Sequence, residues 1–147
     1  MKYAIILLFI SLNTFNFGQL PTVQDATIFS ESFSNAVLIH NEDEILKHID
    51  VDYKKGQLAK LLKGNKEQFI NELLSGFSDQ SEDDLTIDYK IITEMMATSI
   101  GNEESSTDNW KVNFQLKIPE NTINVSILLI AKKSARKLKL GFIGGIG

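Results

Sequence analysis

Three side chains that could transfer protons or hold a metal ion occur at alternate positions in the segment KHIDVDY. They are His48, Asp50 and Asp52. Alternate residues of an extended segment point to the same side, so an extended conformation would bring the imidazole and both carboxylates together. Aspartate also serves turns and helix caps, and we favour this structural role for the two aspartates. The segment therefore predicts no metal site, although a carboxylate site with one histidine stays open.

The other patterns of catalytic or metal-binding residues are weaker still. The chain has two histidines and no cysteine, which excludes a histidine-rich or thiolate zinc site and a cysteine nucleophile. It also lacks the G-x-S-x-G motif that would support a serine hydrolase. The glycine-rich end, LKLGFIGGIG, has neither of the usual phosphate-loop spacings, and we interpret it as part of a last strand. We expect no catalytic residue and no cofactor, and the pattern identifies no ligand-binding residue.

Length and charge limit the class of protein. The chain has 147 residues and a formal net charge of −4, which suits one globular domain and gives no electrostatic reason to bind nucleic acid. The basic turn KKSARK could touch a phosphate or an acidic partner, but a solvated turn explains it equally well.

The amino terminus predicts export. One cation at Lys2 precedes an apolar run from Ala4 to Leu12, and the following residues are more polar. This order is typical of a secretory signal peptide, here residues 1–19. A membrane span needs about 20 apolar residues, and this run is too short. We therefore expect a mature domain of residues 20–147 without a membrane span. Because it lacks cysteine, we expect it in a bacterial periplasm or outside the cell.

The first half of the mature chain has helical periodicity. A stripe that begins with Phe29 and Phe33 predicts a helix from about Thr27. Asn41 and Asn65 are the expected caps of later helices, Gly64 ends an intervening one, and Gly76 lies just past the last. The apolar positions assigned to these helices are Phe29, Phe33, Ala36, Val37, His40, Ile45, Leu46, Ile49, Leu58, Leu61, Leu62, Phe69, Leu73 and Leu74.

The second half alternates between apolar and polar residues, the pattern of strands. The four expected strands cover about 85–100, 110–118, 123–129 and 138–142, joined by short turns. Because the helices come first and the strands second, we predict an α+β fold in which amino-terminal helices pack on a curved four-stranded antiparallel meander.

The outer face of this sheet should be polar but has apolar positions. If the strands pair in order, these are Ile92, Met96, Leu128, Ile130 and Ile143. An exposed apolar patch usually marks an interaction surface, so we predict a homodimer or a protein partner at this face. A helix or the 101–109 loop folded over the patch is the alternative.

This layout resembles the nuclear transport factor 2-like superfamily, a cone of helices wrapped by a bent sheet. The likeness is carried by the helical segments from FSESFSNAVLIHNEDEILKHIDVDY to NKEQFINELLSGF and by the meander that ends in KLKLGFIGG. Cystatin-like folds are the neighbouring alternative. The resemblance implies no activity, because no catalytic constellation of that superfamily matches these residues. We expect a non-catalytic exported domain that binds a small ligand or a protein. The alternative is a small enzyme that uses Asp52, Tyr53 or His48 inside the cone.

Overall fold

A computed structural model describes residues 20–50, 65–76, 78, 86–103, 106–132 and 137–140 of the chain. Several features discussed above lie outside these residues: the signal peptide at 1–19, the helix around Leu58 to Leu62, the middle of the basic turn KKSARK, and the glycine-rich end after Leu140.

The first described helix, α2 (Val23–Leu38), begins at a capping box. The Thr22 hydroxyl accepts a hydrogen bond from the Asp25 backbone N–H, and the Asp25 carboxylate accepts one from the Thr22 backbone N–H. The predicted stripe is confirmed for Phe29, Phe33, Ala36 and Val37, which are buried. His40 differs from its prediction, because the helix ends at Leu38 and His40 lies beyond it, exposed and at φ 57°.

Two further helices, α3 (Glu42–Lys47) and α5 (Lys66–Gly76), begin where their caps predict. The Asn41 side chain accepts a hydrogen bond from the Glu44 backbone N–H, and Asn65 accepts one from Gln68. In each case a side-chain oxygen satisfies a backbone donor that the first turn leaves without a helical partner. The asparagine-cap predictions are therefore confirmed at both positions.

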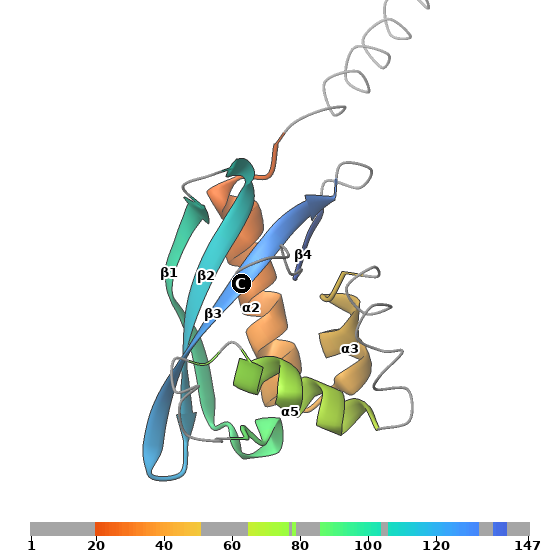
Figure 1. Cartoon of the computed structure of the whole chain (residues 1–147), viewed down its shortest axis with the longest axis vertical. Coiled ribbons are helices and arrows are strands. Elements are labelled where there is room, and N and C mark those ends of the chain that lie inside the picture. Colours follow the sequence, from red (N-terminus) through yellow and green to blue (C-terminus); the bar gives the residue numbers. More distant parts are fainter. Residues whose placement is uncertain are drawn as a thin grey trace, which may run out of the picture.

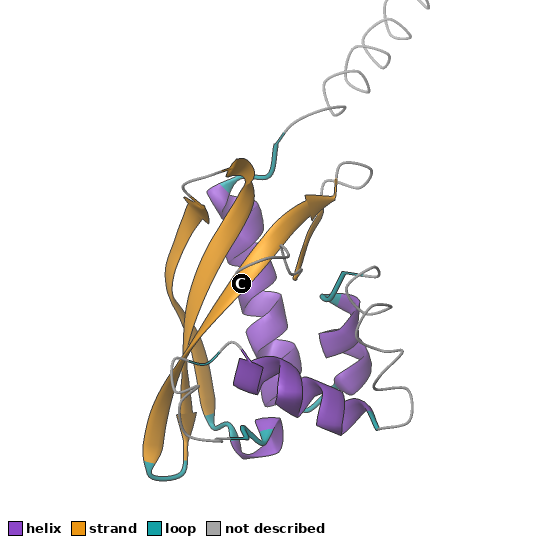
Figure 2. Cartoon of the chain, in the orientation of Figure 1, coloured by secondary structure: helices purple, strands orange, loops and turns teal. Residues whose placement is uncertain are grey.

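The strands form the predicted antiparallel meander. They are β1 (Glu94–Glu103), β2 (Ser106–Ile118), β3 (Asn121–Lys132) and β4 (Lys137–Leu140), and they lie in the order β1-β2-β3-β4 (Figure 1; strands in orange in Figure 2). Alternate residues of β2 and β3 point inward, which is why the period-two pattern succeeded. The buried members on these strands are Trp110, Val112, Phe114, Leu116, Ile123, Val125, Ile127 and Leu129.

The first strand begins nine residues later than predicted, at Glu94 rather than Leu85. The alternation through Tyr89 and Ile91 belongs to a short 3-10 helix, η1 (Tyr89–Ile91). The Asp88 side chain accepts a hydrogen bond from the Lys90 backbone N–H, and the Asn71 side chain accepts one from Tyr89. These side-chain acceptors compete with a strand ladder for the same backbone donors, and the turn is formed instead.

The helices cover one face of the sheet. Helix α2 packs along the strands, α3 packs on α2, and α5 packs on α3 and η1 (Figure 1). The Phe33 ring contacts the Phe114 ring across the layers at a centroid distance of 6.1 Å. The fold class predicted from the sequence, α+β with helices on a four-stranded antiparallel meander, is confirmed.

Candidate functional site

The acid–base cluster considered but not favoured for the KHIDVDY segment does not take an extended form at its first residue. His48 ends α3 with φ −76° and ψ −14°, which is a helical conformation. Asp50 is buried, with 3% of its surface exposed. Asp52 and Tyr53 lie outside the described residues. Alternate side chains point to the same side only in an extended segment. Because His48 has a helical conformation, this rule does not align His48 with the two aspartates.

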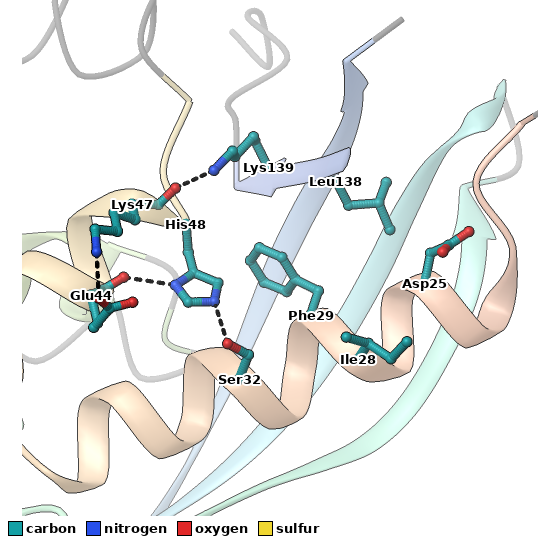
Figure 3. A pocket seen from close by; sticks show the side chains of 9 residues that line it. All are labelled: Asp25, Ile28, Phe29, Ser32, Glu44, Lys47, His48, Leu138 and Lys139. Carbon is teal, nitrogen blue, oxygen red and sulfur yellow. Dashed lines mark hydrogen bonds and ion pairs between the residues drawn. The ribbon is translucent and has the colours of Figure 1, made fainter. Parts of the chain in front are cut away.

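His48 instead lines a surface cleft of about 370 Å³ between α2, α3 and β4 (Figure 3). Three apolar side chains contribute to the walls: Ile28 and Phe29 from α2, and Leu138 from β4. Polar and charged side chains lie beside them, namely Ser32, Glu44, His48 and Lys139, with Asp25 and Lys47 also lining the cleft. The cleft therefore combines an apolar surface with hydrogen-bonding and ionic groups.

The imidazole of His48 bridges two helices. Its Nδ1 lies 2.7 Å from the backbone carbonyl oxygen of Glu44, and its Nε2 lies 2.9 Å from the hydroxyl oxygen of Ser32. A carbonyl oxygen can only accept, so this contact assigns the ring proton to Nδ1. In the neutral ring Nε2 is then an acceptor, and the Ser32 hydroxyl donates to it. The ring also packs edge-on against Phe29 and Phe33, at centroid distances of 5.2 and 5.7 Å.

The surroundings keep this imidazole neutral. Burial lowers the pKa of His48 below its ordinary value of 6.5, and the positive charge of Lys139 acts in the same direction. The Glu44 carbonyl and carboxylate act in the opposite direction but more weakly overall. At pH 7 the ring therefore presents a lone pair to Ser32 rather than a proton.

The charges around the cleft are held by local contacts. Lys47 forms an ion pair with Glu44 one turn earlier in α3. The ammonium of Lys139 donates to the Lys47 carbonyl oxygen, which joins β4 to the end of α3. Asp25 accepts hydrogen bonds from Thr22 in the capping box. These contacts connect the polar groups of the cleft to α2, α3 and β4.

The outer face of the sheet carries only part of the predicted apolar patch. Ile92 is 4% exposed and belongs to the core, because η1 turns the chain before β1 begins. Met96 is 55% exposed, whereas Leu128 and Ile130 are half-buried. Met96 pairs with Gln115 and Leu128 with Lys111, so strand spacings separate Met96 from Leu128 by roughly 16 Å. Ile143 lies outside the described residues.

A second groove lies between α2 and β1, with a volume of about 510 Å³. Met95, Met96, Ala97 and Ile100 line its strand side. Glu31 is the one ionisable group among its lining residues. This groove therefore has fewer ionisable side chains than the cleft at His48.

Comparisons with known proteins add no relative: no family model, no curated protein and no solved structure matches this chain. Among the described residues, no group of three or more histidine, aspartate or glutamate side chains could hold a metal ion. No helix within the same residues is long and apolar enough to cross a membrane.

Sequence reasoning identified His48 but missed Ser32. The two residues are 16 positions apart and belong to different helices. No local motif joins them, and only the packing of α3 on α2 brings them together. The one indirect signal is that Ser32 lies three residues after Phe29 and therefore on a neighbouring part of the same helix surface.

Proposed function

We propose that this protein is a small exported domain that binds a small ligand in the cleft between α2, α3 and β4. The observation that carries the proposal is the convergence there of an apolar wall and fixed polar groups. Small-molecule sites in proteins occupy about 300–1,000 Å³ and combine apolar lining with a few placed polar groups. The cleft at His48, with its volume of about 370 Å³, has both properties.

The lining indicates what such a ligand must contain. Ile28, Phe29 and Leu138 favour an apolar group of a few carbons, since burying apolar surface is the main gain in such a site. The nearby Lys139 supplies a hydrogen-bond donor for a polar end. The Ser32 hydroxyl donates its proton to His48, so its oxygen can accept a hydrogen bond from the ligand. An amphiphilic small molecule with an oxygen-bearing head fits this combination.

Export is the second element of the proposal. It is supported by the signal-like pattern of residues 1–19 and by the lack of cysteine. The order of helices followed by a meander agrees with the layout on which the resemblance to the nuclear transport factor 2-like superfamily rests, and that resemblance stays a prediction. Amino-terminal sequencing of the secreted or periplasmic protein tests export, and a protein that retains Met1 would contradict it.

An enzyme is the second candidate function, and one observation favours it. The hydroxyl of Ser32 donates to a neutral histidine, which is the pairing that activates serine in many acyl-transfer sites. The sequence alone predicts a non-catalytic domain, because no sequence motif indicates the pairing of Ser32 with His48.

Association through the outer sheet face is a third proposal. It rests on Leu128 and Ile130, which occupy alternate positions of β3 and so face the same side. Since Ile92 is in the core, the surface that remains is small. We therefore expect either weak self-association or a partner that covers these two side chains.

Ligand-observed nuclear magnetic resonance against a fragment library tests binding in the cleft. Ser32→Phe should fill the cleft and abolish binding of the fragments found. Ala97→Phe is the matched control, because it adds the same ring in the groove between α2 and β1. Loss of binding in Ala97→Phe alone would place the ligand in the groove between α2 and β1 and contradict the proposal. A library in which no fragment binds would also contradict it.

A further inference from the structure

We propose that Ser32 is a nucleophile that takes short apolar acyl groups from esters, with His48 as the base that removes its proton. This inference rests on the proposed function, because it requires the same cleft to receive a small molecule. It goes further by naming a reaction and a class of substrate for that site.

The geometry meets the requirements of a nucleophile and its base. An activated serine needs a base within about 2.6–3.2 Å, and the base must itself be oriented by a third group. Nε2 of His48 lies 2.9 Å from Ser32 Oγ, and the Glu44 carbonyl oxygen holds Nδ1 at 2.7 Å. The rings of Phe29 and Phe33 fix the plane of the imidazole from α2. The third group is a backbone carbonyl, which selects the tautomer without adding a negative charge.

Ser32 is an exposed residue that lines the cleft. The neighbouring serines on α2 differ, because Ser30 is 2% exposed and Ser34 is 8% exposed. The Ser30 hydroxyl also donates to the Ala26 carbonyl oxygen. Of these three serines, Ser32 is the one that combines an exposed position with a histidine acceptor.

The cleft favours a small substrate with a short acyl chain. Ile28, Phe29 and Leu138 line it beside Ser32 and provide the apolar contact. A long chain would extend beyond a volume of about 370 Å³. The charged groups that line the cleft around His48 are Asp25 on α2, Glu44 and Lys47 on α3, and Lys139 on β4. Lys139 lines the same cleft, and its positive charge acts on the imidazole. It therefore favours an electron-rich oxygen in the substrate.

The reaction proceeds in two balanced halves. In the first, Ser32 Oγ bonds to the ester carbonyl carbon while its proton moves to His48 Nε2. The bond to the ester oxygen then breaks, and the leaving alcohol takes the proton from Nε2. In the second half, water attacks the acyl-serine, gives its proton to Nε2, and Ser32 leaves with that proton as the carboxylic acid is released. No oxidant or additional group is consumed.

Labelling with a fluorophosphonate probe tests the proposal on the purified protein. The probe forms a bond between phosphorus and a nucleophilic serine oxygen and releases fluoride, so peptide mass spectrometry locates the reacted residue. We expect the added mass on the peptide that contains Ser32. His48→Gln should slow labelling by about 10²-fold, the lower end of what a positioned base contributes.

A matched control separates activation from simple exposure. Ser126 is also exposed, but its hydroxyl donates to the Asn113 side chain on the opposite face of the sheet. Ser126→Ala should leave the labelling unchanged, whereas Ser32→Ala should remove it. The rate with the unsubstituted protein should rise with pH and level off above the pKa of His48, and this step should be absent in His48→Gln.

Several results would overturn the proposal. Labelling spread evenly over exposed serines, or labelling of Ser32 that His48→Gln does not slow, would show that the contact does not activate the hydroxyl. If fragments bind the cleft but Ser32 is never labelled, the acyl-transfer proposal fails while the binding function stands. If Ser32 is not labelled and no fragment binds, both fail.

Discussion

Nε2 of His48 and Oγ of Ser32 lie 2.9 Å apart and join helix α3 to helix α2 at the wall of the cleft. The same imidazole contacts a backbone carbonyl of its own helix and two phenylalanine rings of α2. One side chain therefore supports the packing of two helices and also supplies the basic group of the proposed site. Stability and reactivity can be separated by substituting the two partners one at a time.

Replacement of His48 by alanine should lower the free energy of unfolding by about 1–3 kcal/mol, because it removes two hydrogen bonds and two ring contacts. Ser32→Ala should cost less, about 0.5–1.5 kcal/mol, since only one hydrogen bond is lost. Urea denaturation followed by fluorescence of the single tryptophan, Trp110, measures both, because this residue is 7% exposed in the folded protein. If Ser32→Ala lowered the free energy of unfolding as much as His48→Ala or more, the stabilising role assigned to the ring contacts would be wrong.

Stability should depend on pH through His48. Burial lowers the pKa of His48 in the folded protein below its ordinary value of 6.5, so the unfolded chain binds the proton more tightly. The contribution of this residue is complete above pH 6.5 and is lost as the pH falls from 6.5 toward the folded pKa. Urea midpoints measured across this range should fall as the solution becomes more acidic.

His48→Gln is the control for this pH effect, because glutamine does not titrate. The slope of stability against pH just below pH 6.5 should be smaller in this variant. A slope that is unchanged in His48→Gln would show that other groups cause the dependence.

The capping box at the start of α2 should contribute measurably to stability. Thr22→Ala removes the hydroxyl that accepts from the Asp25 backbone N–H, at an expected cost of about 0.5–2 kcal/mol. Thr27→Ala is the control on the same helix, because its hydroxyl only donates back to the Val23 carbonyl oxygen. Alanine has the higher helix propensity, so that change should be close to neutral. Equal losses in the two variants, measured by thermal unfolding, would refute the role of the cap.

Self-association through β3 should be weak. Full burial of one large apolar side chain is worth about 1.5–3 kcal/mol, and Leu128 and Ile130 are already half-buried. The free energy gained by fully burying these two side chains offsets only part of the entropy cost of association. We expect sedimentation velocity to show a small dimer fraction at hundreds of micromolar (the order that such few contacts imply), and Leu128→Lys to abolish it. A dimer that survives Leu128→Lys would place the contact elsewhere.

Most of the fold could be predicted because its signals are local. Asn41 and Asn65 mark helix starts through contacts within one turn, and the period-two pattern around Phe114 identifies an inward-facing strand. Tyr89 follows the same alternation, but a side-chain acceptor from α5, Asn71, holds its backbone N–H in a turn. That competition acts between elements distant in the sequence.

The site was harder to predict for the same reason. His48 attracted attention as one of two histidines, but its expected partners were aspartates at alternate positions of an extended segment. The residue is helical and its partner is Ser32, on another helix. A serine in the middle of an amphipathic helix has no distinguishing local pattern. Tertiary packing alone gives it a role.

Titration of the isotopically labelled protein with the tightest fragment found for it, followed by two-dimensional nuclear magnetic resonance, tests the central claim most directly. That claim is that the cleft between α2, α3 and β4 is the binding site. Saturable shifts should be largest at Phe29, Ser32, His48 and Leu138, which line this cleft. Shifts centred on Met95, Ala97 and Ile100 would place the ligand in the groove between α2 and β1 and would contradict the account.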